Sequence, residues 1–198
     1  DKYVYIQVLS SNFTGYYKYN DDGSAIHLVN CGIHCNDTVF IDCVSYNGCG
    51  GAIYINNTLD MINNATFADI MFIRCKASYG GAVFIYANSY LFNISFTRCY
   101  FEANKATLTK PSKGDKQYLY GGGAIFLMSR KFDVLNSTFV NNTGGSVKIF
   151  GQFDDDERKL LENDENSISI RGCYFEEDDN SKGSINYIDE KSIINIDI

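Results

Sequence analysis

A short phrase of glycine, a small residue and an aliphatic residue returns six times in this chain of 198 residues. The clear copies are CGGAIYI at 49–55, YGGAVFI at 79–85 and GGGAIFL at 121–127. Looser copies are DGSAIHL at 22–28, TGGSVKI at 143–149 and KGSINYI at 182–188. Self-similarity with a period of roughly 20 to 50 residues is typical of repeat proteins, whose units pack against their neighbours. This repeat constrains the fold more than any other feature of the sequence.

The residues that follow the glycines alternate in character, as in a strand with one buried face. One column is aliphatic in every copy: Ile26, Ile53, Val83, Ile125, Val147, Ile185. The next column holds residues of every kind: His27, Tyr54, Phe84, Phe126, Lys148, Asn186. Successive side chains of a strand point to opposite faces, so the aliphatic column predicts the buried face.

A second phrase carries a phenylalanine column between the glycine phrases: Phe40, Phe72, Phe101, Phe139, Phe175. Strand-like runs such as FDVLNSTF at 132–139 precede it, so each unit holds about three short strands. One unit cannot bury its own apolar columns, but units stacked in parallel, about 4.8 Å apart, can. The sequence therefore predicts an all-β parallel β-helix, a solenoid of about six coils with three short strands each. We expect one domain over 1–198, or a segment of a longer solenoid, with loop insertions near 107–120 and 151–166.

The segment FEANKA at 101–106, followed by GGGAIF at 121–126, resembles the F-x-x-N-x-A…G-G-A-I repeat of the polymorphic outer membrane proteins. FIRCKASYGGAVFI at 72–85 matches as well, with Cys75 where that family has Asn. The resemblance extends from about Gly23 to the end of the chain. It implies a right-handed, single-stranded β-helix with a surface or adhesive role. The Asn-, Ile-, Lys- and Tyr-rich composition favours a eukaryotic surface protein of this type.

The sequon N-x-S/T, which marks acceptors of N-linked glycans, occurs seven times. The acceptors are Asn12, Asn36, Asn56, Asn64, Asn93, Asn136 and Asn141. An asparagine-rich chain collects some sequons by chance, which is the competing explanation. We interpret their number as a sign of a glycoprotein that is secreted or displayed on the extracellular surface.

Seven cysteines give this interpretation a second test. Cys43 and Cys75 share a column on successive coils, about 4.8 Å apart, which is within reach of a disulfide. We predict a bridge between them and a further bridge within the group Cys31, Cys35, Cys49. Cys99 and Cys173 also share a column, but the intervening coil separates them, so we predict no bridge between those two.

Cofactors and metals are not expected. The segment CGIHCND at 31–37, with His27 nearby, admits a zinc site as an alternative, but its spacing matches no usual zinc finger. The acidic runs DDDE at 154–157, ENDEN at 162–166 and EEDD at 176–179 are interpreted as solvated loops rather than calcium sites. The net charge of −7 argues against nucleic-acid binding, and no apolar run reaches the ~20 residues of a membrane span, so no direct membrane insertion is expected.

The outward positions offer little for catalysis. Asp42 and Arg74 align on neighbouring coils and are interpreted as a surface ion pair, so no catalytic residues are predicted. Outward Tyr54, Phe84 and Phe126 form either a contact surface or a stripe that the 107–120 insertion covers. We predict a non-enzymatic structural or adhesive glycoprotein that binds cell-surface glycans or proteins, or itself by end-to-end stacking of its open edges into filaments. The alternatives are a carbohydrate-active enzyme, resembling polysaccharide lyases or hydrolases, and a passive ligand-binding module.

Overall fold

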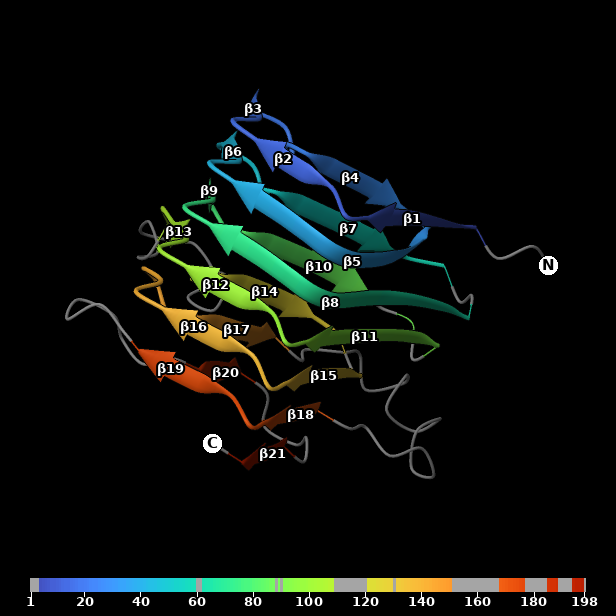
Figure 1. Ribbon diagram of the computed structural model, residues 1–198. Coiled ribbons are helices and arrows are strands. Elements are labelled where there is room, and N and C mark those ends of the chain that lie inside the picture. Colours follow the sequence, from blue (N-terminus) through green and yellow to red (C-terminus); the bar gives the residue numbers. More distant parts are fainter. Residues whose placement is uncertain are drawn as a thin grey trace.

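The fold is all-β and its strands pair in parallel (Figure 1). The computed structural model describes residues 4–59, 62–87, 89, 91–108, 121–129, 131–150, 168–176, 185–188 and 194–197. No helix occurs within these ranges. The predicted insertions near 107–120 and 151–166 lie almost wholly outside them.

The strands form three sheets. The 11-stranded sheet contains β1 (Tyr5–Leu9), β2 (Asn12–Thr14), β5 (Gly32–Ile41), β8 (Asn63–Ile73), β11 (Phe92–Thr97), β12 (Tyr100–Glu102), β15 (Phe132–Leu135), β16 (Thr138–Val140), β18 (Ile168–Arg171), β19 (Tyr174–Glu176) and β21 (Ile194–Asp197). The 6-stranded sheet contains β4 (Ile26–Val29), β7 (Ile53–Asn57), β10 (Val83–Ala87), β14 (Ile125–Met128), β17 (Val147–Phe150) and β20 (Ile185–Ile188). The 4-stranded sheet contains β3 (Tyr17–Tyr19), β6 (Val44–Tyr46), β9 (Lys76–Ala77) and β13 (Lys105–Ala106).

In its first four circuits the chain visits the 11-stranded, 4-stranded and 6-stranded sheets in turn and then begins again. In the later circuits the described strands belong to the 11-stranded and 6-stranded sheets alone, and we call each circuit a pass. Equivalent residues of successive passes are strand partners, as in the run Ile53, Val83 and Ile125. The predicted column alignment is therefore confirmed, and the stacked parallel strands fit the β-solenoid class (Figure 1).

Aromatic rings stack through the core at the predicted phenylalanine column. Consecutive ring centroids are 4.7 to 5.0 Å apart over the run Phe13, Phe40, Phe72, Phe101, Phe139, Phe175. The ring planes are within 9° of parallel at each step. The distance between ring centroids equals the spacing of neighbouring strands in a sheet. Each ring therefore packs face to face on the next and shields it from water.

The two glycines of the repeated phrase have different tasks. Gly80 has φ +58°, a conformation that L side chains rarely adopt. A Cβ on Gly81 would lie 2.0 Å from the carbonyl oxygen of Gly123 on the next pass. The first glycine therefore turns the chain, whereas the second lets two passes approach backbone to backbone.

Buried amide and thiol side chains stabilise the same bend in four successive passes. Asn104 accepts from the backbone N–H of Cys75 (2.9 Å) and donates to the carbonyl of Phe72 (2.9 Å). Asn142 repeats the pattern one pass later, with Phe101 as its carbonyl partner. In the earlier passes Cys43 and Cys75 take the position, and their thiols point at the carbonyls of Phe13 (3.6 Å) and Phe40 (3.7 Å). Cys thus replaces Asn because both can donate to the same carbonyl of the preceding pass.

The structure differs from the predicted three strands per coil in one respect. The two strand runs on either side of the predicted second turn belong to one bent sheet, and in β5 and β8 they are continuous. The third side is the 4-stranded sheet, whose strands are only two or three residues long. Such short segments show no alternation in the sequence, so the sequence analysis missed them.

Replacing Phe72 with Ala tests the ring column. Phe72 is fully buried between two stacked rings, so its loss should lower the free energy of unfolding by about 3 to 5 kcal/mol. Met71→Ala on the same strand is the matched control, because Met71 is exposed and should change stability by less than about 0.5 kcal/mol. Urea unfolding followed by circular dichroism compares the two, and equal losses would contradict a stacked core.

Candidate functional site

All seven sequon asparagines point outward. Five are exposed and two are half-buried; in chain order they are Asn12, Asn36, Asn56, Asn64, Asn93, Asn136 and Asn141, with Asn36 and Asn56 the half-buried ones. Six of them lie in the 11-stranded sheet or directly beside its strands, and Asn56 lies in the 6-stranded sheet. No strand of the 4-stranded sheet carries a sequon. Glycosylation itself stays a prediction.

Cys43 and Cys75 lie on successive passes as the sequence predicts, because the flanking pairs Ile41–Ile73 and Val44–Lys76 are strand partners. Both side chains are buried, and the structure holds both as thiols. A hydrogen bond from Cys75 lowers the pKa of Cys43, whereas burial raises the pKa of Cys75. The predicted bridge between them is not formed in the structure and stays a prediction.

A further bridge between Cys31 and Cys35 does not fit the geometry. The chain is extended in β5, so four residues separate their Cα atoms by about 13 Å, well beyond disulfide reach. Cys49 lies in the bend before β7. Its backbone N–H donates a hydrogen bond of 2.6 Å to the carboxylate of Asp22. Burial raises the pKa of Cys35 to about 11 and that of Cys49 to about 12. All three are thiols in the structure.

The alternative zinc site is not assembled. His34 is exposed and Cys35 is buried, because adjacent residues of β5 point to opposite faces. The His34 ring instead hydrogen-bonds the hydroxyl of Thr66 at 2.7 Å. Within the described ranges no three His, Cys, Asp or Glu side chains converge as metal ligands.

Cys99 and Cys173 share a column with Ser137 between them, as the sequence predicts. The pairs Tyr100–Thr138 and Thr138–Tyr174 fix this register. Both cysteines are buried thiols, and burial raises the pKa of Cys99 to about 12.

Two surface ion pairs mark the bends of the 11-stranded sheet. Arg74 binds both carboxylate oxygens of Asp42 at 2.8 Å, which confirms the predicted pair. Arg98 binds Asp69 in the same bidentate way at 2.7 and 2.6 Å, a pair that the sequence analysis missed. The repeat alignment could have predicted this pair, since Asp69 and Arg98 occupy one column on successive passes. In each pair the hydrogen bonds from arginine lower the pKa of the carboxyl group.

The predicted aromatic stripe exists on the 6-stranded sheet. The rings of His27, Tyr54, Phe84 and Phe126 follow one another at centroid distances of 4.9, 5.5 and 5.1 Å. Exposure falls along the stripe: His27 is exposed, Tyr54 and Phe84 are half-buried, and Phe126 is buried. Only its first part is therefore open to a partner. Residues 109–120, the suggested cover, lie outside the described ranges.

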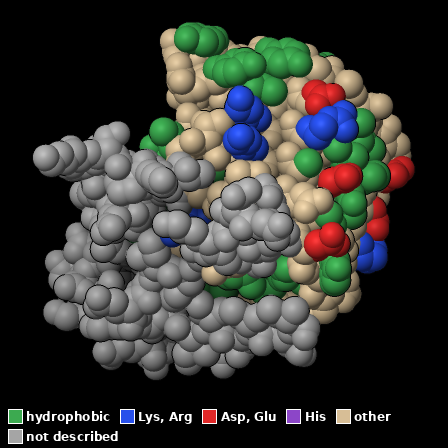
Figure 2. All heavy atoms as spheres, turned by 90° about the vertical axis from the view of Figure 1, so that its left-hand side faces the viewer, with side chains coloured by type: hydrophobic (Ala, Val, Ile, Leu, Met, Phe, Trp, Pro, Cys, Tyr) green, Lys and Arg blue, Asp and Glu red, His purple; other side chains and the backbone are tan. Residues whose placement is uncertain are grey.

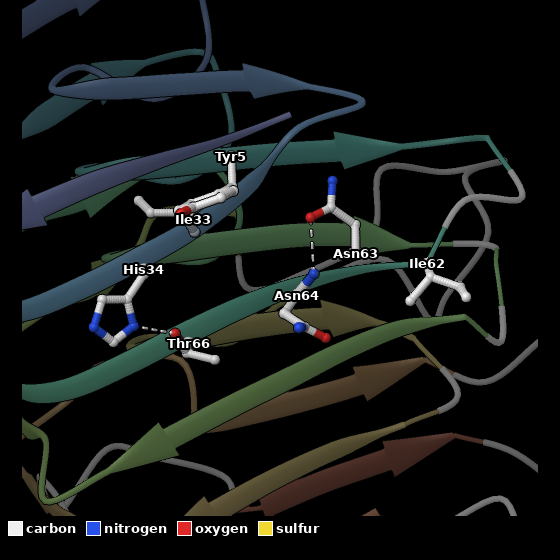
Figure 3. A pocket seen from close by; sticks show the side chains of 7 residues that line it. All are labelled: Tyr5, Ile33, His34, Ile62, Asn63, Asn64 and Thr66. Atoms are coloured by element: carbon white, nitrogen blue, oxygen red, sulfur yellow. Dashed lines mark hydrogen bonds between the residues drawn. The ribbon is translucent and has the colours of Figure 1, made fainter. Parts of the chain in front are cut away.

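A hollow of about 590 Å³ lies on the first three passes (Figure 3). Its lining combines an aromatic ring, two aliphatic side chains and four polar side chains: Tyr5, Ile33, Ile62, His34, Asn63, Asn64, Thr66. Asn63 is committed to the backbone, since it donates to the carbonyl of Val4 (3.2 Å) and accepts from the N–H of Asn64 (3.0 Å). Among the described residues that line it there is no carboxylate.

The 4-stranded sheet presents a surface that the sequence analysis did not find, which we name the tyrosine–lysine face: Tyr17, Tyr19, Tyr46, Lys76, Lys105. The three tyrosines are 63%, 72% and 43% exposed, respectively. The Tyr19 and Tyr46 ring centroids are 6.1 Å apart, and the Lys76 ammonium lies 5.6 Å from the Tyr46 centroid. Figure 2 looks at the side of the molecule that carries this sheet and shows basic side chains one above the other near hydrophobic ones.

The first pass has one unpaired edge in the part of the chain that the structure describes. Strands β1 to β4 each pair only with the second pass. Their inward side chains Ile6, Val8, Phe13 and Leu28 pack against the core yet remain half-exposed. One further pass of parallel strands would cover both the backbone groups and these side chains. Among the described residues no helix has the length and apolar character needed to cross a membrane.

Thiol counting tests the cysteine predictions. The protein is unfolded in guanidinium without reductant, alkylated with iodoacetamide and weighed by mass spectrometry. Seven labels are expected if every cysteine is a thiol, and five if Cys43 and Cys75 are bridged. Peptide mapping then identifies the unlabelled pair, and a pair between Cys31 and Cys35 would contradict the extended geometry of β5.

The ion pairs make a pH-dependent prediction. Arg74→Gln should raise the pKa of Asp42 towards its ordinary value, because the hydrogen bonds that favour the carboxylate are lost. The folded pKa is the lower one, so the pair stabilises the fold above the unfolded pKa and loses this effect as pH falls through the folded pKa. The pair is exposed to solvent, so the loss of stability should be small. Carboxyl NMR titration measures the shift, and Arg98→Gln, the control, should move Asp69 and leave Asp42 unchanged.

Comparisons with protein-family models, with curated proteins and with solved structures find no match for this chain. Its function is therefore argued from its own surfaces and edges.

Proposed function

We propose that this chain is a right-handed, single-stranded parallel β-helix that serves as a non-enzymatic structural or adhesive glycoprotein of the extracellular surface. Its partners are copies of itself, which stack end to end, and cell-surface glycans or proteins. The observation that carries the proposal is the register of the passes, in which equivalent residues of successive passes are parallel strand partners and like side chains stack. The edge formed by β1 to β4 presents parallel strands and half-exposed apolar side chains of the same kind.

An end-to-end contact suits the chemistry of that edge. A parallel partner strand would satisfy backbone groups of β1 to β4, and apolar columns would continue across the junction. Phe13 stacks on Phe40 at 4.8 Å, and a ring from another copy would extend the same column. Such a contact is heterologous, because the first pass of one copy meets the last pass of another, and it builds a filament.

The placement of the sequons supports a glycoprotein. Five of the seven acceptor side chains are exposed, so a glycan at each of these five meets solvent rather than packed residues. Asn64 and Asn93 even share a column, with the amide of Asn93 donating to Asn64 at 3.3 Å. Many glycans on the 11-stranded sheet would obstruct a long substrate groove there, which disfavours a polysaccharide-cleaving enzyme.

The outward carboxylates of the bends also suit an ion-pairing role better than catalysis. A general acid needs a pKa near the working pH, whereas arginine lowers the pKa of Asp42 and of Asp69. Each carboxylate has both oxygens occupied by one guanidinium group. The pairs therefore tie neighbouring passes together.

Val8→Lys tests the assembly. Val8 is a half-buried, inward side chain of β1, and a lysine there would leave a charge inside an end-to-end junction. We expect the parent chain to form linear oligomers in sedimentation velocity and negative-stain images, and Val8→Lys to shift them at least tenfold towards monomer. Gln7→Lys, on the outward face of the same strand, should leave assembly unchanged. A parent chain that stays monomeric at every concentration would contradict the filament proposal.

A further inference from the structure

We propose that the tyrosine–lysine face binds a linear acidic polysaccharide, with its chain running along the stacking direction and its carboxylate or sulfate groups at Lys76 and Lys105. This inference rests on the proposed adhesive function and specifies the ligand class and the surface. It concerns the 4-stranded sheet alone and is independent of the end-to-end edge.

Lys76 and Lys105 are neighbouring positive charges without an acidic ion-pair partner among the described residues. Lys76 and Lys105 are direct strand partners, so their Cα atoms lie about one strand spacing apart, ~4.8 Å. Among the described residues neither forms an ion pair, although Lys18 on the first pass pairs with Asp21 at 3.1 Å. Like charges placed directly opposite each other in a sheet repel. An anion held between the two ammonium groups removes that repulsion, so the site favours a bound acid.

The tyrosines favour a carbohydrate over a simple anion. Tyr17, Tyr19 and Tyr46 lie on the first two passes. Tyr17 shares the column of the lysines, with the buried Val44 between Tyr17 and Lys76, whereas Tyr19 and Tyr46 pair with each other two residues further along their strands. Each presents an apolar ring with a hydroxyl at its tip, which matches the C–H faces and hydroxyl groups of a pyranose. Tyr46 touches both groups of residues, since it contacts the Tyr19 ring and the Lys76 ammonium. Sugar stacking and acid binding therefore occur on one continuous strip.

The width of the strip selects a single polymer chain. Strands β3, β6, β9 and β13 are two or three residues long, which makes the sheet about 7 to 10 Å wide. A bilayer is a broad plane and would also meet the remaining surface of a chain with net charge −7. Nucleic acid requires denser basic clusters than two lysines. A linear glycan meets the narrow strip without having to lie on the rest of the surface.

No strand of the 4-stranded sheet carries a sequon, since all seven lie in, or directly beside, strands of the other two sheets. Asn141 is near one end of the face, because Thr143 of its sequon bridges to Lys105. A glycan on Asn141 would therefore border the lysines, whereas β3, β6, β9 and β13 themselves carry no acceptor.

Binding to immobilised polysaccharides tests the inference with the full 198-residue chain. The probes are polygalacturonate for carboxylates, dextran sulfate for sulfates and plain dextran as the neutral reference, measured by biolayer interferometry at two salt concentrations. We expect binding to one or both acidic probes, at least tenfold weaker at the higher salt, and none to dextran. The stronger acidic probe identifies which anion the ligand carries.

The double variant Lys76→Gln/Lys105→Gln should weaken acidic-probe binding at least tenfold, and Tyr46→Ser should weaken it several-fold. Lys131→Gln is the matched control, since Lys131 precedes β15 on the 11-stranded sheet, and it should bind like the parent. The variant side chains point outward, so an unchanged melting temperature shows that the fold is kept. Equal binding by the double variant, equal binding to dextran, or equal binding to anionic phosphatidylserine vesicles would each overturn the inference.

The assembly experiment separates this failure from failure of the proposed function. Val8→Lys should abolish end-to-end assembly while each chain keeps its affinity for the acidic probe. If assembly occurs as expected and no acidic probe binds, the structural role stands and the ligand assignment is wrong.

Discussion

The structure depends on registered stacking of parallel passes. Backbone hydrogen bonds between passes place each residue directly over its counterpart, and like side chains then meet across every junction. The phenylalanine column, the asparagine and cysteine bend, and the aspartate–arginine pairs are all products of this one register. A shift of one residue would turn every aliphatic column towards solvent, so the register is strongly specified.

The same register explains why such different residues occupy equivalent places. At one bend, Asp42, Arg74, Ala103 and Asn141 all have φ near +53°. Their backbone conformation costs free energy for any residue with a Cβ, and it is held by the passes above and below. The side chains project outward from there, so they are free to differ and to form pairs between passes.

Much of the fold followed from the sequence because the repeat fixes which residues stack. The aliphatic and phenylalanine columns, the bend position of Cys75 and Asn104, and the Asp42–Arg74 pair were predicted from alignment alone. The tyrosine–lysine face was not, because segments such as Lys105–Ala106 are too short to show alternation. The bridge between Cys43 and Cys75 stays a prediction, since adjacency permits a bridge without requiring one. Exposure along the aromatic stripe depends on what covers it, which no local pattern encodes.

Mechanical response should depend strongly on the direction of load. The hydrogen bonds between passes point along the stacking direction. Tension applied along that axis therefore pulls these bonds apart one junction at a time. Tension applied along the strands loads all bonds of a junction together in shear and meets far greater resistance. A protein built this way resists load in the plane of its strands and yields to load along its length, so the direction of the applied load decides which of the two responses is seen.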